Sequence, residues 1–116
     1  ITGTFEITKS YLMENTYNIG RHVVDYHRVS PNDVMIIISN SGNNIAPVDA
    51  AIRAKEKGIP VIAITAVEYS NFLKCQHKDG VKLKDVADVV LDNTGTIETL
   101  EQQIKQRLED LHAYID

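Results

Sequence analysis

The chain has 116 residues, of which 43% are hydrophobic and 24% are charged, and its formal net charge is −4. That is enough chain for one domain with one core, and its charge does not suit nucleic acid or an anionic membrane. The first residues do not have the pattern of a signal peptide, and no run reaches the roughly 18 to 20 apolar residues that cross a bilayer. A lone cysteine, Cys75, has no partner for an internal disulfide. We therefore expect one cytoplasmic domain that binds neither nucleic acid nor membrane.

The first half of the chain predicts a helix, a strand, a second helix and a second strand. Residues 9–29 carry apolar side chains at helical spacing and end before a proline, which disfavours helical geometry in its predecessor. Residues 34–38 form a continuous apolar run, typical of a strand buried on both faces of a parallel sheet. Pro47 suits the first turn of a helix that ends near Gly58, and residues 61–65 predict another buried strand.

The second half predicts a third strand and a long helix. Residues 88–92 enclose three consecutive apolar residues and form the third strand. From Thr96, which suits an N-cap, an apolar stripe repeats every three or four residues as far as Ile115. Strands that alternate with helices are typical of an α/β fold, a parallel sheet with flanking helices. Ligands of such sheets collect outside the carboxyl ends of the strands.

Polar residues follow the first buried strand in an order that suits an anion. Ser39 and Ser41 each offer a hydroxyl, and Gly42 allows backbone amides to approach a ligand. The next helix begins near Pro47, and a helix N-terminus carries about half a positive charge. By itself, this segment fits a phosphate-binding loop and an ordinary polar loop with an asparagine cap equally well.

A family resemblance separates these two interpretations. The segment 33–43, a hydrophobic strand followed by Ser, Asn, Ser and Gly, is similar to the strand and phosphate loop of sugar isomerase (SIS) domains. The similarity extends over roughly residues 9–93 and looks strongest to the uncharacterised SIS subfamily near phosphoheptose isomerase. It implies a flavodoxin-like SIS fold and a phosphorylated sugar as ligand. It also implies the contacts to that ligand, which are Ser39, Asn40, Ser41 and Gly42 at the phosphate and Thr65 and Ser70 at the next strand end.

Two features of complete SIS domains are not visible in the sequence, namely an earlier helix and a central strand that ends in a Gly- and Ser-rich turn. The resemblance therefore implies one SIS-type domain over residues 1–116 that lacks the N-terminal part of a complete one. A start at Ile1, without an initiator Met, fits either a fragment or a processed form.

Isomerisation of an aldose phosphate to a ketose phosphate requires a base that moves a proton between adjacent carbons. The catalytic glutamate of phosphoheptose isomerases belongs to the part that is not visible. Glu68, close after the second strand, and His77, in the connection that follows, are the candidate catalytic residues. A solvated loop charge and a structural histidine are the competing interpretations. The sequence thus favours sugar-phosphate binding, as in a regulatory sensor, with a sugar-phosphate isomerase as the alternative.

Nucleotide binding is a weaker alternative. Residues 3–10 have the outline of a P-loop, and residues 92–108 faintly resemble the carboxyl end of dephospho-coenzyme A kinases. Thr8 replaces the glycine whose amide must approach the phosphates, so the motif is broken where backbone access matters most. No metal-ligand spacing joins the histidines, and we expect neither a metal nor a cofactor.

We also expect a homo-oligomer. SIS domains commonly complete their sites with a neighbouring subunit, and a sheet that lacks its first strand exposes backbone groups and apolar side chains. The apolar stripe of the C-terminal helix is a candidate contact surface, although such stripes more often pack on their own sheet.

Overall fold

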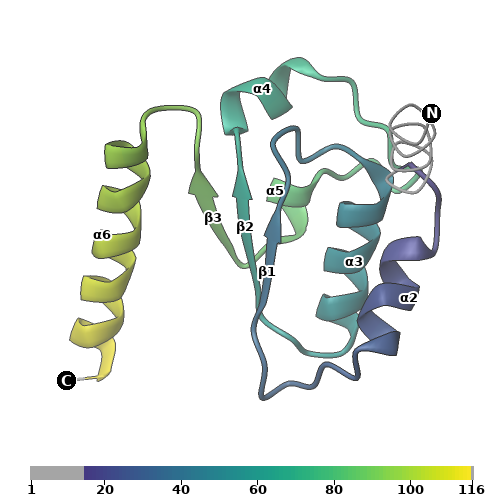
Figure 1. Cartoon of the computed structure of the whole chain (residues 1–116), viewed down its shortest axis with the longest axis horizontal. Coiled ribbons are helices and arrows are strands. Elements are labelled where there is room, and N and C mark those ends of the chain that lie inside the picture. Colours follow the sequence, from purple (N-terminus) through teal and green to yellow (C-terminus); the bar gives the residue numbers. More distant parts are fainter. Residues whose placement is uncertain (1–14, 116) are drawn as a thin grey trace, which may run out of the picture.

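Three parallel strands form the sheet at the centre of the molecule, in the order β1-β2-β3 (Figure 1). The computed structural model describes residues 15–115, and side chains as far as residue 113. The strands are β1 (Met35–Ile38), β2 (Val61–Thr65) and β3 (Val89–Asp92). The register pairs Ile38 with Ile64 and Thr65 with Asp92, so all three carboxyl ends meet at one edge. The predicted α/β class, a parallel sheet with flanking helices, is confirmed.

Five helices occur in the described part of the chain. They are α2 (Ile19–Tyr26), α3 (Ile45–Glu56), α4 (Val67–Phe72), α5 (Leu83–Val86) and α6 (Ile97–Ile115). The predicted N-cap of the last helix is confirmed, because the hydroxyl oxygen of Thr96 accepts a hydrogen bond from the amide of Thr99 at 3.2 Å. Among these helices, none combines the length and apolar character that a bilayer span needs.

The core lies on one face of the sheet, beneath α3. Its buried side chains come from α2, α3, α5, β2 and the turn before β2, and they are Val24, Val48, Ala51, Ala54, Ile59, Val61, Ala63 and Leu83. Gly20 brings α2 close against α3, because a Cβ at this position would lie 2.1 Å from the carbonyl oxygen of Ala46. The inner face of the sheet is therefore covered by two layers of helix, α3 and then α2 (Figure 1).

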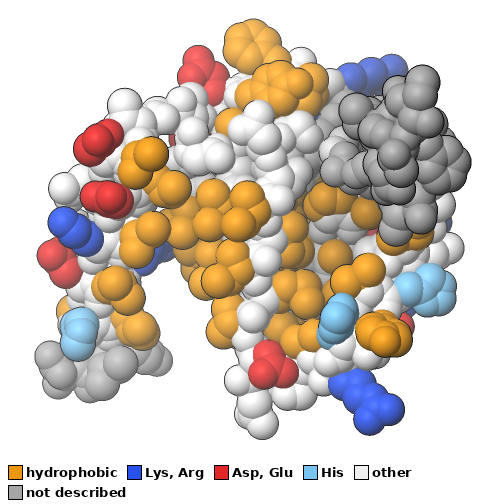
Figure 2. All heavy atoms as spheres, viewed as in Figure 1, with side chains coloured by type: hydrophobic (Ala, Val, Ile, Leu, Met, Phe, Trp, Pro, Cys, Tyr) orange, Lys and Arg blue, Asp and Glu red, His pale blue; other side chains and the backbone are white. Residues whose placement is uncertain are grey.

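The opposite face of the sheet is largely open. We call it the outer face, and it carries Ile36, Ile38, Ile62, Ile64, Val89 and Leu91. Ile36 is 60% exposed and Ile38 is 71% exposed, so the prediction that residues 34–38 are buried on both faces is wrong. The reason is that α3 and α5 pack on the inner face and α2 packs on α3, whereas on the outer face α6 packs mainly against β3. Figure 2 shows hydrophobic side chains gathered between α6 and the sheet.

A further expectation about the helices needs correction. The helix predicted over 9–29 begins at Ile19 and ends at Tyr26, because Asn18 and Arg28 adopt positive φ angles of 72° and 53°. Residues 9–14 lie outside the described part of the chain, as does the P-loop outline at 3–10. The connection between β2 and β3 contains α4 and α5, two short helices that no periodic pattern in the sequence predicts.

Candidate functional site

The loop that follows β1 lies at the carboxyl edge of the sheet. We call residues 39–44 the β1–α3 loop. It is tied to the neighbouring strand, because the amide of Ser39 donates to the carbonyl oxygen of Ile64 at 3.0 Å and the amide of Ala66 donates to that of Asn40 at 3.0 Å. These bonds hold the loop at the point where ligands of parallel sheets bind.

The two serine hydroxyls of this loop are oriented by the backbone. The Oγ of Ser39 accepts a hydrogen bond from the amide of Gly42 at 3.1 Å, and the Oγ of Ser41 accepts one from the amide of Asn43 at 3.3 Å. A hydroxyl has one proton to donate in addition to the lone pairs that accept. Each serine therefore keeps its proton for a further acceptor, such as a phosphate oxygen.

Gly42 is required by the shape of the loop. Its φ angle of 58° lies in the left-handed region, and a Cβ at this position would lie 2.7 Å from the Oγ1 of Thr65. Its carbonyl oxygen accepts a hydrogen bond from the amide of Leu83 at 2.8 Å, which joins the loop to α5. The loop is thus held on one side by β2 and on the other by α5.

Thr65 and Ser70, which the resemblance places in contact with the ligand, are both fully buried. The hydroxyl of Thr65 donates to the carbonyl oxygen of Asn40 at 3.2 Å. The Oγ of Ser70 has no hydrogen-bond partner within the described structure and would lie 3.5 Å from a Cβ at Gly42. Both side chains therefore lie behind the loop, and their contact with a ligand stays a prediction.

A cavity of about 340 Å³ opens over the β1–α3 loop. Its walls are Ile38, Ser39, Asn40, Ser41, Asn44, Pro47 and Tyr69. None of these side chains is charged, and the first turn of α3 carries no acidic residue. An anion in this cavity would meet serine hydroxyls and the N-terminus of α3, whose first amides have no partner inside the helix.

A second cavity, of about 360 Å³, adjoins the first. Its walls are Asn40, Ala66, Glu68, Tyr69, Phe72, Asn93 and Thr94. Asn40 and Tyr69 line both cavities, so the two spaces meet at these side chains. Glu68, a predicted catalytic residue, therefore lies beside the β1–α3 loop. Sequence reasoning did not single out Tyr69, Asn93 or Thr94, although their positions just after β2 and β3 are a usable signal.

Asp92 fixes the start of α4 and so the place of Glu68. Its Oδ1 accepts hydrogen bonds from the amides of Val67 at 3.1 Å and Thr94 at 2.9 Å, and from the Thr94 hydroxyl. Burial raises the pKa of Asp92, but the hydrogen bonds from Thr94 and Val67 outweigh it and hold the pKa below its ordinary value. The Oγ1 of Thr94 also accepts from the amide of Glu68 at 3.3 Å. The ends of β2 and β3 are thereby connected.

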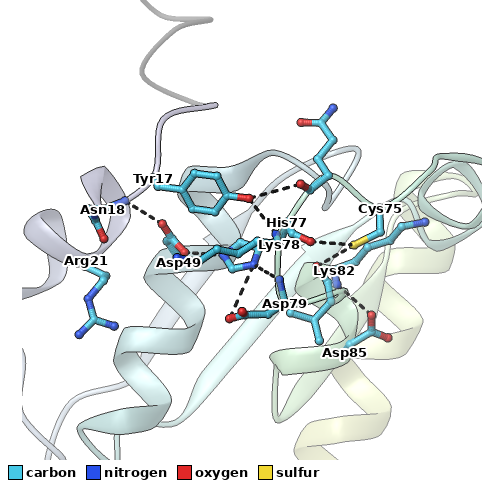
Figure 3. Close-up of polar contacts among 12 residues, drawn as sticks. Tyr17, Asn18, Arg21, Asp49, Cys75, His77, Lys78, Asp79, Lys82 and Asp85 are labelled. Carbon is cyan, nitrogen blue, oxygen red and sulfur yellow. Dashed lines mark hydrogen bonds and ion pairs between the residues drawn. The ribbon is translucent and has the colours of Figure 1, made fainter.

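His77, the other predicted catalytic residue, lies in a buried polar network (Figure 3). It lines neither of the two cavities. Its side chain is 1% exposed, and its Nε2 lies 2.6 Å from the Oδ1 of Asp49. The amide of Asp79 donates to Nδ1 at 3.1 Å, so we assign the ring proton to Nε2, which donates to Asp49. The other carboxylate oxygen of Asp49 accepts from the amide of Asn18 at 2.9 Å.

This network gives His77 a structural role. It joins the start of α2 to α3 and to the loop after α4, because Asn18, Asp49 and His77 belong to these three segments. The ring of Tyr17 packs edge-on against His77 with centroids 5.2 Å apart, and its hydroxyl oxygen accepts from the amide of Lys78 at 2.8 Å. Catalysis by His77 stays a prediction that this geometry does not support.

Lys82 is a buried lysine that the sequence analysis did not predict. Its ammonium donates to the carbonyl oxygens of Ser70 and Leu73 at the carboxyl end of α4. Its backbone amide donates to the Oδ2 of Asp85 at 2.9 Å, at the start of α5. Lys82 therefore fixes α4, which carries Tyr69 and Glu68. Within the described residues, no group of three His, Cys, Asp or Glu side chains lies close enough to hold a metal ion.

Comparison with known proteins identifies the family that the chain resembles. The family model described as "SIS domain" matches residues 1–66, which include the β1–α3 loop. A UPF0309 protein of Geobacillus kaustophilus is 39% identical over 85 residues, which are 73% of this chain and 34% of that protein. A UPF0309 protein of Halalkalibacterium halodurans is 42% identical over 89 residues, which are 77% of this chain and 37% of that protein. The chain spans about a third of the length of these relatives.

Proposed function

Because the chain belongs to the SIS domain family, we propose that it binds a phosphorylated sugar and that the β1–α3 loop holds the phosphate. Membership of this family suggests phosphosugar binding or an isomerase-like function. The observation that carries our proposal is the orientation of Ser39 and Ser41, whose oxygens accept backbone amides and whose protons remain to be donated. Asn40 and Gly42 are the other two residues of the loop that we expect to contact the phosphate.

The adjoining cavity suits the sugar end of the same ligand. Tyr69 and Phe72 offer aromatic surface against a sugar ring, and Glu68 and Thr94 offer polar groups to its hydroxyls. Because Asn40 and Tyr69 line both cavities, one small ligand reaches from the loop into the second space. This arrangement supports a sugar phosphate over free phosphate.

The proposal is tested by thermal shift against inorganic phosphate, hexose phosphates, heptose phosphates and the matching free sugars, followed by calorimetric titration of the best ligand. We expect a sugar phosphate to raise the melting temperature and the free sugar to leave it unchanged. Ser39→Ala together with Ser41→Ala should weaken binding more than about tenfold, because each hydrogen bond to a charged group contributes about 1.5 to 3 kcal/mol. Unchanged affinity in the double variant would contradict the assignment of the loop.

Ser70→Ala is the matched control for that pair. It also removes one serine hydroxyl, but from a buried position behind the loop. Its burial favours an unchanged affinity, whereas a loss comparable to that of the double variant would support the contact that the resemblance implies.

An isomerase is the second candidate function, favoured by the Glu68 carboxylate in the cavity beside the loop. An enzyme of this kind should interconvert a sugar phosphate in a coupled assay, and Glu68→Gln should slow it by about 100-fold to 10,000-fold while binding persists. We expect binding without turnover, as in a sensor. Turnover clearly above the uncatalysed rate would overturn the sensor interpretation, and turnover that survives Glu68→Gln would exclude Glu68 as the base.

A further inference from the structure

The chain that leaves α4 runs beside the β1–α3 loop and is itself held in place. We call residues 73–76 the α4 exit. At its start, the ammonium of Lys82 donates to the carbonyl oxygen of Leu73. Further along, the thiol of Cys75 donates to the carbonyl oxygen of Val81 at 3.3 Å. The α4 exit is therefore a fixed support for whatever is bonded to it.

One side chain of the β1–α3 loop is bonded to the α4 exit, that of Asn43. It is only 2% exposed. Its Nδ2 donates to the carbonyl oxygen of Lys74 at 2.9 Å, and its Oδ1 accepts from the amide of Gln76 at 3.3 Å. Exchanging the two atoms would set donor against donor and acceptor against acceptor, so these partners fix the orientation of the side-chain amide. Asn43 is thus anchored through both of its polar atoms, as a buried amide requires.

The backbone of the same residue orients Ser41. The amide of Asn43 donates to the Oγ of Ser41 at 3.3 Å. Ser41 lines the cavity over the loop, whereas Asn43 lines neither of the two cavities at the strand ends. Because the amide that holds its oxygen is anchored to the α4 exit, Ser41 is kept in one rotamer with its proton left to donate.

Ser39 is held by a different support. Its Oγ accepts from the amide of Gly42 at 3.1 Å, and the carbonyl oxygen of Gly42 accepts from the amide of Leu83 in α5. The two serines therefore have separate anchors. Ser39 depends on α5, whereas Ser41 depends on the α4 exit through Asn43.

We propose that Asn43 is a positioning residue that strengthens phosphate binding through Ser41 without touching the phosphate. This inference rests on the proposed function, because it concerns the same loop. Loss of the Asn43 side chain releases the loop from the α4 exit and leaves the Ser41 hydroxyl free to rotate. The hydroxyl must then be ordered when the phosphate binds, and the entropy lost in this step weakens binding.

A double-mutant cycle tests this role. Calorimetric titration measures the affinity for glucose 6-phosphate and for sedoheptulose 7-phosphate, and the tighter of the two serves for all variants. Asn43→Ala should weaken binding about tenfold. In the Ser41→Ala background the same substitution should change the affinity less than about twofold, because the hydroxyl that it positions is absent. In the Ser39→Ala background it should again weaken binding about tenfold, because Ser39 has its own anchor.

Two further variants separate positioning from stability. Val24→Ala removes part of a buried core side chain on α2, so it should lower the melting temperature and leave the affinity unchanged. Asn43→Ser keeps a hydroxyl at the buried position and serves where the alanine variant does not fold. Its shorter side chain does not reach as far as that of asparagine, so it should show the same dependence on Ser41. Far-UV circular dichroism melts establish that each variant is folded at the temperature of the titration.

An Asn43 substitution that leaves the affinity unchanged overturns the proposal. So does one that weakens binding equally with and without the Ser41 hydroxyl, or one that depends on Ser39 as strongly as on Ser41. In each of these cases the wild-type chain still binds the sugar phosphate, so the proposed function stands. If the wild-type chain binds neither sugar phosphate, the proposed function is wrong and this inference is wrong with it.

Discussion

The two faces of the sheet differ in what covers them. On the inner face, Val61 and Ala63 are fully buried beneath α3, which is covered in turn by α2. On the outer face, Ile36 and Ile38 are more than half exposed, although they belong to the same apolar run as the inward-pointing Ile37. The contacts that hold the described part of the chain together therefore lie mainly on the inner face, while the apolar side chains of β1 on the outer face stay exposed.

The largest expected effect is the difference between a core isoleucine and an isoleucine on the outer face of the sheet. Ile59 is 1% exposed in the core, so Ile59→Ala should lower the free energy of unfolding by about 2 to 5 kcal/mol. Ile36→Ala removes the same atoms from the outer face and should cost the monomer less than about 1 kcal/mol. Chemical denaturation at low protein concentration measures both values. Equal losses would contradict the difference between the faces.

The next effect concerns the polar network beside the core. His77→Ala leaves the buried carboxylate of Asp49 without the imidazole and should cost about 3 kcal/mol in unfolding free energy. His22→Ala is the control, because His22 is exposed on α2. If His77→Ala kept full stability and abolished turnover of a sugar phosphate, the structural role would be wrong and the catalytic prediction would stand.

A smaller effect is expected at the strand ends. Gly42→Ala combines a positive φ angle with a Cβ only 2.7 Å from Thr65, so it should cost about 1 to 3 kcal/mol and weaken phosphate binding. Gly80→Ala also has a positive φ angle, 70°, but its Cβ meets nothing within 4 Å. It should cost less and leave binding unchanged. Thermal melts and titration of the two variants separate backbone strain from the loop contact.

The smallest effect is the response to acid. The Lys55 ammonium and the amide of Val61 lower the pKa of Asp88 on the inner side of the sheet, as the hydrogen bonds of Thr94 do for Asp92. Because these pKa values are lower in the folded chain, the unfolded chain binds more protons as the pH falls. The contribution of these two carboxylates to the free energy of unfolding is therefore fully present above about pH 4 and is lost as the pH falls below it. Because both groups are partly exposed, each contributes at most about 1 kcal/mol. Chemical denaturation at a series of pH values measures this effect. Asp88→Asn should make the free energy of unfolding depend less steeply on pH, and an unchanged dependence would contradict the role of Asp88.

The features that could be predicted from the sequence are those that depend on local patterns, namely the strands, the edge at which they end and the cap of the last helix. The apolar runs located β1, β2 and β3, and parallel pairing then brought Ser39, Ser41 and Glu68 to one edge, because the strands end there. Thr96 capped the last helix as expected because its side chain acts within one turn. These features need only a few neighbouring residues to be recognised.

The remaining features depend on contacts between distant segments. Asp49 and His77 are 28 positions apart, and neither residue alone indicates a buried pair. A β-branched run such as 34–38 fits both a central strand and a half-covered strand, so the open outer face could not be predicted from it. Helices as short as α4 and α5 carry too few residues for a periodic pattern.

The most direct test of the proposed function is a site-resolved NMR titration of ¹⁵N-labelled protein with the sugar phosphate that gives the largest thermal shift. We expect the amide resonances of the β1–α3 loop and of Tyr69 to shift together with one affinity, while those around His77 stay in place. The matching free sugar should leave the loop resonances unchanged. Shifts that avoid Ser39, Asn40, Ser41 and Gly42, or that appear equally with the free sugar, would contradict phosphate binding at this loop.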